Sequence, residues 1–154
     1  FQIVEKCWRK AEGQWVVKDV VFTERWGEED YRFLCQCLQN TVATGGQVWG
    51  AFLEGRLKGF ASVEGPLVGS RKQYADLTSI HVSADARGHG LGRRLFLLAE
   101  DTARQLGAEA LYISAHSAVE SQAFYKAMGC VEAAEYLPAH VEQEPCDCQL
   151  ESRV

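Results

Sequence analysis

The pattern of hydrophobic and polar positions predicts a β-hairpin and then a helix in the first third of the chain. Strand-forming residues dominate 3–22, and the polar segment 11–14 interrupts them like the turn of a hairpin. From 28 to 42 the hydrophobic residues recur at helical spacing, and two glycines follow as a stop signal. The predicted inner face of this helix consists of Tyr31, Leu34, Cys35, Leu38 and Val42.

A second hairpin and a further strand are predicted in the middle of the chain. Residues 48–53 and 57–63 have strand composition, and Glu54 and Gly55 between them form a two-residue turn in which glycine can adopt a positive φ angle. The segment 74–82 has similar composition and predicts another strand.

The helix predicted over 91–106 has the clearest periodicity in the chain. Its predicted inner face consists of Leu91, Leu95, Leu98, Thr102 and Leu106. Glu100 and Arg104 have the spacing of an i,i+4 ion pair on another face, and Gly107 ends the helix. A short buried strand is predicted over 111–115.

One more helix and one more strand are predicted toward the C-terminus. Ser117 and Glu120 have the spacing of a capping box, so a helix is predicted from there to Met128. Cys146 and Cys148 alternate with polar residues, which predicts a half-buried strand with both cysteines facing the core.

This order of elements predicts an α/β fold with a mixed sheet flanked by helices. With 154 residues, 47% of them hydrophobic, the chain can bury one sizeable core and is too short for two ordinary domains. We therefore expect a single domain over 1–154.

Charge and hydropathy limit the partners of the protein. The chain carries 21 acidic and 16 basic residues, and no block of Lys and Arg marks a surface for nucleic acid. No apolar run has the length of a membrane span, and the first residues do not resemble a signal peptide. We expect a cytoplasmic protein that binds neither nucleic acid nor membranes.

The six cysteines could form three disulfides, but the chain is longer than small disulfide-stapled domains. Neither C-x-C pair has the spacing of a zinc site, and on a helix Cys35 and Cys37 point to nearly opposite faces. We expect no metal site and six buried free thiols.

The segment RGHGLG, residues 87–92, joins a predicted strand to the long helix. Backbone N–H groups and the positive end of the helix dipole converge there and attract phosphate, and Arg87 and Arg93 can add charge-assisted hydrogen bonds. A Walker A motif is absent, and Arg93 stands where a dinucleotide motif requires its third glycine. Taken alone, the glycines fit equally well a tight turn without a ligand.

Two motifs in this order resemble the GNAT superfamily of N-acetyltransferases. RGHGLG matches the [RQ]-x-x-G-x-[GA] signature, whose loop binds the pyrophosphate of coenzyme A, and AFYKAMG at 123–129 is similar to the F-Y-x-x-x-G helix of the family. The resemblance covers about 74–131. It implies a mostly antiparallel mixed sheet with a splayed strand pair that holds coenzyme A, and acetyl-CoA as the acyl donor without a metal.

The resemblance also implies which residues contact acetyl-CoA. Backbone groups of the strand before the loop pair with the pantetheine arm, and one N–H stabilises the developing oxyanion. Ala118 stands where members commonly carry an Asn, so Ser117 and His116 are alternatives for that contact. The predicted contact residues are Ile80, His81, Val82, Arg87, Gly88, His89, Gly90, Leu91, Gly92, Arg93, Ser117, Ser121, Phe124 and Tyr125.

The reaction needs a base, because an alkyl amine with a pKa of about 10.4 is protonated at neutral pH. The resemblance assigns this role to Asp76, at the start of the strand before the loop. His81 has a more suitable pKa of about 6.5, but strict alternation places it on the opposite face unless a bulge intervenes. Ordered water is the third alternative. By resemblance, Tyr125 protonates the departing thiolate.

The sequence thus predicts an enzyme that transfers the acetyl group of acetyl-CoA to a primary amine of a small molecule by direct attack in a ternary complex. A non-catalytic acyl-CoA binding module and a protein N-acetyltransferase are the alternatives. The first 46 residues carry no family motif and are expected to shape the acceptor site. The acceptor and the formation of a homodimer are left open.

Overall fold

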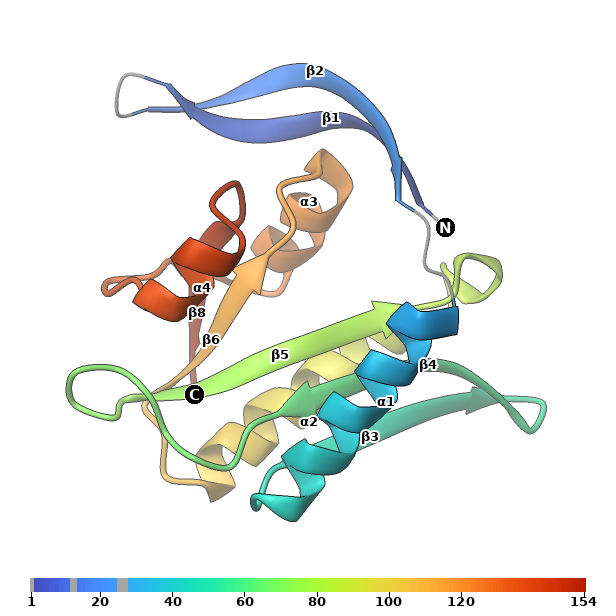
Figure 1. Ribbon diagram of the computed structural model, residues 1–154, viewed down its shortest axis with the longest axis vertical. Coiled ribbons are helices and arrows are strands. Elements are labelled where there is room, and N and C mark those ends of the chain that lie inside the picture. The colour runs from blue at the N-terminus through green and yellow to red at the C-terminus, as the bar shows by residue number, and fades with distance from the viewer. Residues whose placement is uncertain (1, 12–13, 25–27) are drawn as a thin grey trace.

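Figure 1 shows a computed structural model of the chain, which describes the backbone of residues 2–11 and 14–24 and all of residues 28–154. Its elements are β1 (Gln2–Ala11), β2 (Gln14–Glu24), α1 (Glu28–Ala43), β3 (Gln47–Leu53), β4 (Arg56–Val63), β5 (Tyr74–Val82), a 3-10 turn (Ala84–Ala86), α2 (Leu91–Gln105), β6 (Ala110–Ala115), α3 (Val119–Ala127), β7 (Val131–Glu132), α4 (Pro138–Gln143) and β8 (Cys148–Arg153).

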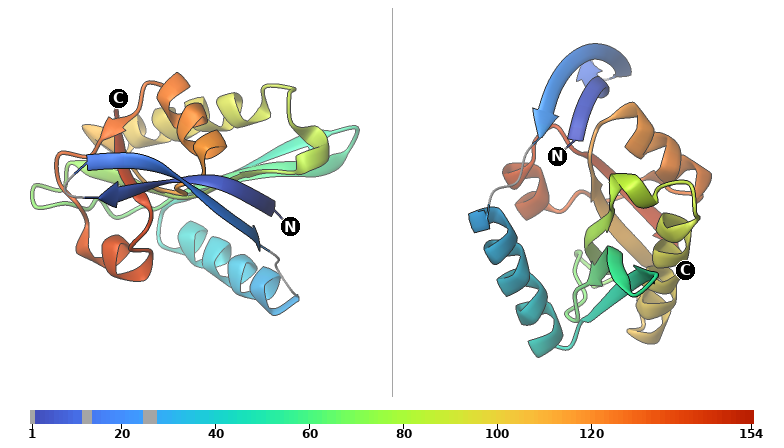
Figure 2. Two further views of the ribbon diagram at one scale, coloured as in Figure 1. Left: turned by 90° about the horizontal axis from the view of Figure 1, so that it is seen from above. Right: turned by 90° about the vertical axis from the view of Figure 1, so that its right-hand side faces the viewer.

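The main sheet has six strands in the order β3-β4-β5-β6-β8-β7. Its pairs are antiparallel except β5 with β6, which run parallel. Helices α2 and α3 cover one face of the sheet, and α1 and α4 lie on the other (Figure 2). The predicted mixed, mostly antiparallel sheet flanked by helices is therefore confirmed.

Both predicted hairpins are present. Strands β1 and β2 pair antiparallel and form a two-stranded sheet of their own, which lies above α3 and α4 in the view of Figure 1. Strands β3 and β4 are joined by Glu54 and Gly55, with φ angles of 51° and 76°. Positive φ at both central residues gives a turn whose twist matches that of the strands.

Helix α2 supplies most of the core on its face of the sheet, but its buried stripe differs from the predicted one. Leu95, Phe96, Ala99 and Ala103 pack against the sheet, whereas Leu98 is exposed. The predicted pair between Glu100 and Arg104 is wrong. Glu100 is buried and accepts a hydrogen bond from Ser152 in β8 at 2.7 Å, and Arg104 pairs with Asp101.

Helix α1 covers its face of the sheet loosely. Thr41 is its buried residue, and Leu34 and Leu38 are half-buried, while Tyr31 and Val42 are exposed. The inner face predicted from hydrophobicity is therefore rotated, because Thr41 Oγ1 turns inward to donate a hydrogen bond to Glu64 at 2.7 Å.

The prediction of six buried thiols is also wrong for three of them. Cys35 and Cys37 on α1 are exposed, because the helix buries only a narrow stripe, and Cys146 is exposed in the turn before β8. Cys148 in β8 is buried as predicted, Cys130 is half-buried, and Cys7 lies outside the residues whose side chains are described. None of the five described cysteines forms a disulfide.

A partly buried hydrogen bond ties the edge of the sheet to α2. The indole Nε1 of Trp49 in β3 donates to Thr102 Oγ1 at 2.9 Å. We expect Thr102→Val, which keeps the shape and removes the acceptor, to lower the free energy of unfolding by about 1 kcal/mol. Urea unfolding measures the loss, and Thr102→Ser, which keeps the hydroxyl, is the control. Equal stability of the two variants would contradict the contribution of this bond.

The segment after α3 was predicted only in part. The strand β8 is present, but it lies between β6 and β7, and neither β7 nor α4 was predicted. Pro138 stands in the first turn of α4, where proline is favoured. Within the described ranges, every helix is too short or too polar to span a lipid bilayer.

Candidate active site

The site is centred where β5 and β6 separate. The two strands pair only from Tyr74 with Ala110 to Leu77 with Ile113. Beyond Leu77, β5 continues to Val82 and pairs with β4 alone, so no β6 residue pairs with it on the other side. Figure 1 shows the two strands diverging from their common start. The divergence exposes the backbone edge of β5 and opens a wedge through the sheet.

The glycine turn lies at the end of the exposed part of β5. Gly88 and Gly90 have φ angles of 84° and 74°, and Gly90 is the N-cap residue of α2. An added Cβ at either glycine would meet no atom within 4 Å, so the turn requires glycine for its dihedral angles and not for space. This geometry directs the first N–H groups of α2 toward the wedge, where they can bind an anion.

A cavity of about 490 Å³ connects the glycine turn with the wedge. Its walls come from the end of β5, the turn, the start of α2 and one side of α3. The lining residues are Ile80, His81, Val82, Ala86, Arg87, Gly88, Gly90, Leu91, Gly92, Arg93, His116, Glu120, Ser121, Phe124 and Tyr125.

Twelve of the predicted contact residues therefore share one cavity, and two do not line it. His89 turns back on the loop, and its Nδ1 lies 3.1 Å from the carbonyl oxygen of Ala86. Ser117 is buried beneath the start of α3. The alternative contact His116 does line the cavity.

The predicted capping box of α3 is wrong. The N-cap residue is Ala118, one position after Ser117, and it has extended dihedral angles. The N–H group of Ala118 donates to Nδ1 of His116 at 3.0 Å. Because the helix starts one residue later than predicted, Glu120 is its second residue instead of its third, and it lines the cavity instead of closing a box with Ser117.

Tyr125 lies on α3 at the inner end of the cavity. Its ring is buried and contacts Phe96 and Phe124 edge-on, with centroid distances of 6.3 and 5.2 Å. Among the described residues, no hydrogen-bond partner of its hydroxyl is found. Burial raises the pKa of the Tyr125 phenol well above its usual value. The phenol therefore stays protonated at neutral pH and can donate to a ligand.

A β-bulge at Thr78 decides the relation between the two predicted bases. Val63 of β4 pairs with Leu77, and the next residue, Ser62, pairs with Ser79, so Thr78 is the extra residue. The bulge resets the alternation and places His81 on the same face as Asp76, which strict alternation would not do. Of the two, only His81 lines the cavity.

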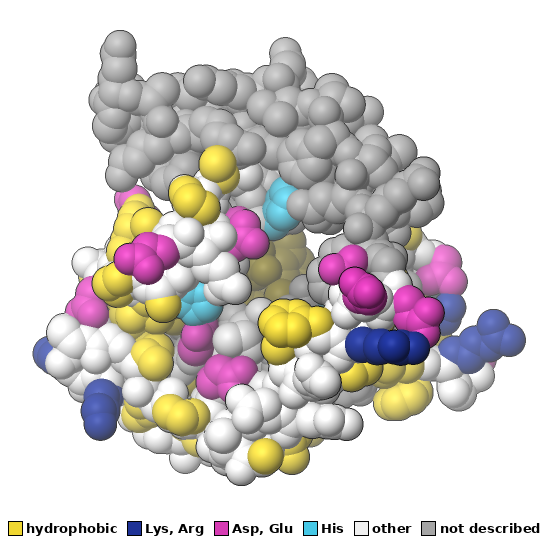
Figure 3. All heavy atoms as spheres, viewed as in Figure 1, with side chains coloured by type: hydrophobic (Ala, Val, Ile, Leu, Met, Phe, Trp, Pro, Cys, Tyr) yellow, Lys and Arg dark blue, Asp and Glu magenta, His cyan; other side chains and the backbone are white. Residues whose placement is uncertain are grey.

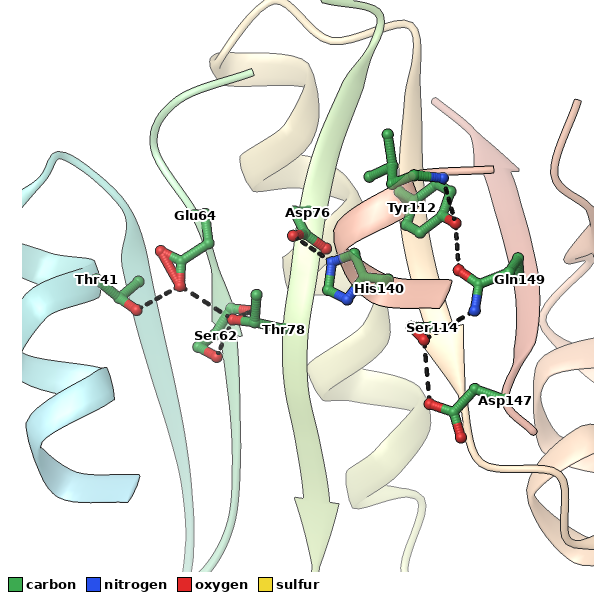
Figure 4. A network of polar contacts seen from close by, with 11 residues as sticks. Thr41, Ser62, Glu64, Asp76, Thr78, Tyr112, Ser114, His140, Asp147 and Gln149 are labelled. Atoms are coloured by element: carbon green, nitrogen blue, oxygen red, sulfur yellow. Dashed lines mark hydrogen bonds and ion pairs between the residues drawn. The ribbon is translucent and has the colours of Figure 1, made fainter. Parts of the chain in front are cut away.

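Asp76 lies on the α1 and α4 face and is engaged by a residue that the sequence did not single out. Its Oδ2 lies 2.7 Å from Nε2 of His140 on α4, and its Oδ1 is buried without a hydrogen-bond partner among the described residues (Figure 4). The hydrogen bond to Asp76, followed by the charge of that carboxylate, raises the pKa of His140, although burial opposes the shift.

Further polar residues gather on this face. Ser114 Oγ donates to Asp147 at 3.0 Å, and Glu64 accepts hydrogen bonds from Thr41 and Thr78 at 2.7 and 3.1 Å (Figure 4). No local sequence signal marks this set, because its members come from five separate segments. The proline that begins α4 was the one local signal for the helix that carries His140.

Comparisons with known proteins agree with the geometry of the site. The sequence profile of the Acetyltransferase (GNAT) family matches residues 6–130. No curated protein sequence matches the chain significantly.

Solved structures share the fold at low sequence identity. A nourseothricin acetyltransferase is 18% identical with a TM-score of 0.71, and the alignment covers 99% of this chain and 86% of that one. A putative streptothricin acetyltransferase from Bacillus anthracis str. Ames, solved with acetyl coenzyme A, is 15% identical with a TM-score of 0.72 and the same coverage. A ribosomal-protein-alanine N-acetyltransferase from Brucella melitensis is 24% identical with a TM-score of 0.62, and the alignment covers 81% and 79%.

The family profile matches most of the chain, and the glycine turn at a helix N-terminus beside a splayed strand pair is where that family binds its acyl donor. The protein is a GNAT-family N-acetyltransferase that uses acetyl-CoA.

Proposed function

We propose that the protein acetylates a primary amine of a small molecule by direct attack of the amine on acetyl-CoA in a ternary complex. One observation carries the proposal. A single cavity of about 490 Å³ runs from the glycine turn to Tyr125, at the point where β5 leaves β6. The cavity connects the anion site at the glycine turn with the phenol of Tyr125, a potential proton donor, along the exposed backbone edge of β5.

The residues present fit acetyl-CoA. The N–H groups at the start of α2, together with Arg87 and Arg93, suit a pyrophosphate. The exposed backbone of 80–82 suits the amide groups of pantetheine, as if the arm were an added strand, and Ser121 supplies a hydroxyl nearby. An N–H group of the same strand segment would stabilise the oxyanion.

The transfer needs two proton movements that balance. The acceptor enters as an ammonium and gives one proton to a base, which passes it to solvent. The neutral amine then forms the new C–N bond, and the C–S bond breaks. Tyr125 protonates the departing sulfur, and the proton released from the new amide nitrogen restores the phenol. The products are the acetylated amine, free coenzyme A and one proton.

Acidic side chains on the α1 and α4 face favour a cationic acceptor. Glu64, Asp76 and Asp147 lie on this face, around the point where the wedge opens (Figure 4). Figure 3 shows acidic and histidine side chains beside a hollow between the two helices. Negative charge around a hollow raises the local concentration of a cationic substrate. Polyamines and amino-bearing antibiotics are the classes we propose.

Thermal unfolding with acetyl-CoA tests the donor site. A ligand at 100 times its Kd stabilises the folded state by about 2.7 kcal/mol, so acetyl-CoA and coenzyme A should both raise Tm, and ATP should not. An unchanged Tm with both coenzyme A species would contradict the donor site.

An amine panel then tests the transfer, with products detected by mass. Spermidine, an aminoglycoside, nourseothricin, lysine and a peptide with a free N-terminus cover the classes, and nourseothricin is included because of the structural similarity reported above. Mass detection is preferred to thiol reagents, because Cys35, Cys37 and Cys146 are exposed. Binding of acetyl-CoA without transfer to any amine would favour a non-catalytic binding module. Acetylation of the peptide alone would favour a protein acetyltransferase.

A further inference from the structure

Asp76 and His140 form a pair that the family motifs do not include. The two residues are 64 positions apart and meet through Oδ2 and Nε2 at 2.7 Å. Asp76 sits on β5, and His140 is brought to it by α4. In such a contact Nε2 carries the proton that Asp76 accepts, so in the neutral imidazole the other ring nitrogen, Nδ1, keeps its lone pair.

The pair stands at the edge of the wedge. Asp76 pairs with Tyr112 of β6, and the next pair, Leu77 with Ile113, is the last before the strands separate. Figure 4 shows the ring of His140 between β5 and β6, with its second nitrogen pointing away from Asp76, in the direction in which β5 runs. That is the direction of the strand segment that lines the acetyl-CoA cavity.

The ring is held in a fixed orientation. It stacks on Tyr112 with a centroid distance of 5.7 Å and an interplanar angle of 24°. The Tyr112 hydroxyl in turn accepts a hydrogen bond from the N–H group of Leu137, the residue before α4, and donates to Gln149. These contacts fix both the ring below the imidazole and the start of the helix that carries it.

Asp76 and His140 differ in how far their side chains are exposed, and this difference assigns them different roles. The Asp76 side chain is 12% exposed, with Oδ2 engaged by His140 and Oδ1 buried, so an incoming amine cannot reach a free carboxylate oxygen. The His140 side chain is 22% exposed. A buried carboxylate oxygen without a partner destabilises the fold, and such a group is often retained at functional sites.

We propose that Nδ1 of His140 takes the proton from the acceptor ammonium, and that Asp76 acts as the positioning residue that fixes the tautomer and orientation of His140. This proposal rests on the proposed amine acetylation. It replaces Asp76 as the direct base and leaves His81, which lines the coenzyme A cavity, with the acyl donor.

The proton moves from the acceptor ammonium to His140 before the C–N bond forms. The ammonium N–H bond breaks, its proton binds Nδ1, and the electron pair stays on the amine nitrogen, which attacks the thioester carbonyl. The imidazolium then carries both protons beside the Asp76 carboxylate, which stabilises it, and Nδ1 releases its proton to solvent before the next turnover.

The groups around His140 set the pKa of its imidazole. Asp76 faces it from β5, Tyr112 from β6 and Asp147 from the segment before β8. The hydrogen bond to Asp76 raises its pKa, and Asp147 adds to the shift. Since His140 acts only when neutral, the rate should rise as pH increases through this raised pKa.

Three variants test the assignment: His140→Gln, Asp76→Asn and, as a control on the same helix, the exposed Glu142→Gln. The pH dependence of kcat/KM is measured with the best acceptor of the amine panel. We expect His140→Gln to lower kcat about 100-fold and to remove the rise of kcat/KM with increasing pH, which is the rising limb of the profile. Asp76→Asn should move that limb to lower pH by about one unit, because burial still disfavours the imidazolium while the carboxylate is gone. Glu142→Gln should match the unmodified protein.

A second measurement does not depend on turnover. The imidazole of His140 is titrated by NMR in the protein without ligands, and acetyl-CoA affinity is measured for each variant. We expect a pKa above 6.5 that falls in Asp76→Asn, with acetyl-CoA Kd changed less than about threefold. If His140→Gln does not fold, the pH profile of Asp76→Asn and the NMR titration of His140 test the assignment of His140 as the base.

The outcomes separate the two proposals. A rising limb that persists in His140→Gln, while acetyl transfer continues, would overturn the assignment of His140 and leave the acetyltransferase function standing. Acetyl-CoA binding by the unmodified protein without transfer to any amine would overturn both.

Discussion

Replacing Tyr125 with Phe is expected to lower kcat about 100-fold or more while the Kd of acetyl-CoA changes less than about threefold. The variant keeps the ring that packs against Phe96 and Phe124 and removes only the hydroxyl. A proton donated to the departing sulfur matters in the transition state and not in the ground-state complex, so the loss should appear in kcat.

Single-turnover acetyl transfer and calorimetric binding of acetyl-CoA measure the two quantities separately. Tyr136→Phe is the matched control, since the Tyr136 hydroxyl donates a hydrogen bond to Glu132 in β7 and lies outside the cavity lining. Because burial raises the pKa of Tyr125, the rate should show no loss from ionisation of this phenol up to about pH 10. An unchanged kcat in Tyr125→Phe would remove the residue from the mechanism.

Replacing Gly90 with Val is expected to weaken acetyl-CoA binding roughly 10- to 100-fold. Gly90 has a φ angle of 74°, and a β-branched residue is strained there even though its Cβ would meet no atom. Relief of this strain would turn the first N–H groups of α2 away from the pyrophosphate site.

Gly55→Val provides a matched control. Gly55 has a φ angle of 76°, its added Cβ would also meet no atom, and it lies in the β3–β4 turn. Both variants should lose similar stability in urea, but only Gly90→Val should lose affinity in calorimetry. Equal acetyl-CoA affinity of the two variants would contradict the role of the glycine turn as an anion site.

Local sequence determined the elements whose signals are contained within a few residues. The second hairpin follows from its Glu-Gly turn, because the required φ angles suit glycine. Helix α2 and the glycine turn before it follow from periodicity and from the sterics of residues 88–92. The family motifs lie in the same segments, so the acyl donor could be predicted along with them.

Interactions between distant segments decided which side chains turn inward. Thr41 is buried in α1 because Glu64, 23 positions away, accepts its hydrogen bond, and no periodicity in the helix records this. Glu100 is likewise buried, because Ser152 in β8, 52 positions away, donates a hydrogen bond to it. Hydrophobic spacing predicts that a helix has an inner face, but the hydrogen-bond partners on other segments decide which residues of the helix lie on that face.

The sequence by itself determined the GNAT family and acetyl-CoA as the donor, since the residues that identify the family lie within two short motifs. Only the tertiary structure decided the acceptor side. The bulge at Thr78 depends on the register between β4 and β5, and the contact between Asp76 and His140 depends on α4, a six-residue helix. Neither feature has a strong local signal, because each is fixed by pairing between segments that are remote in the chain.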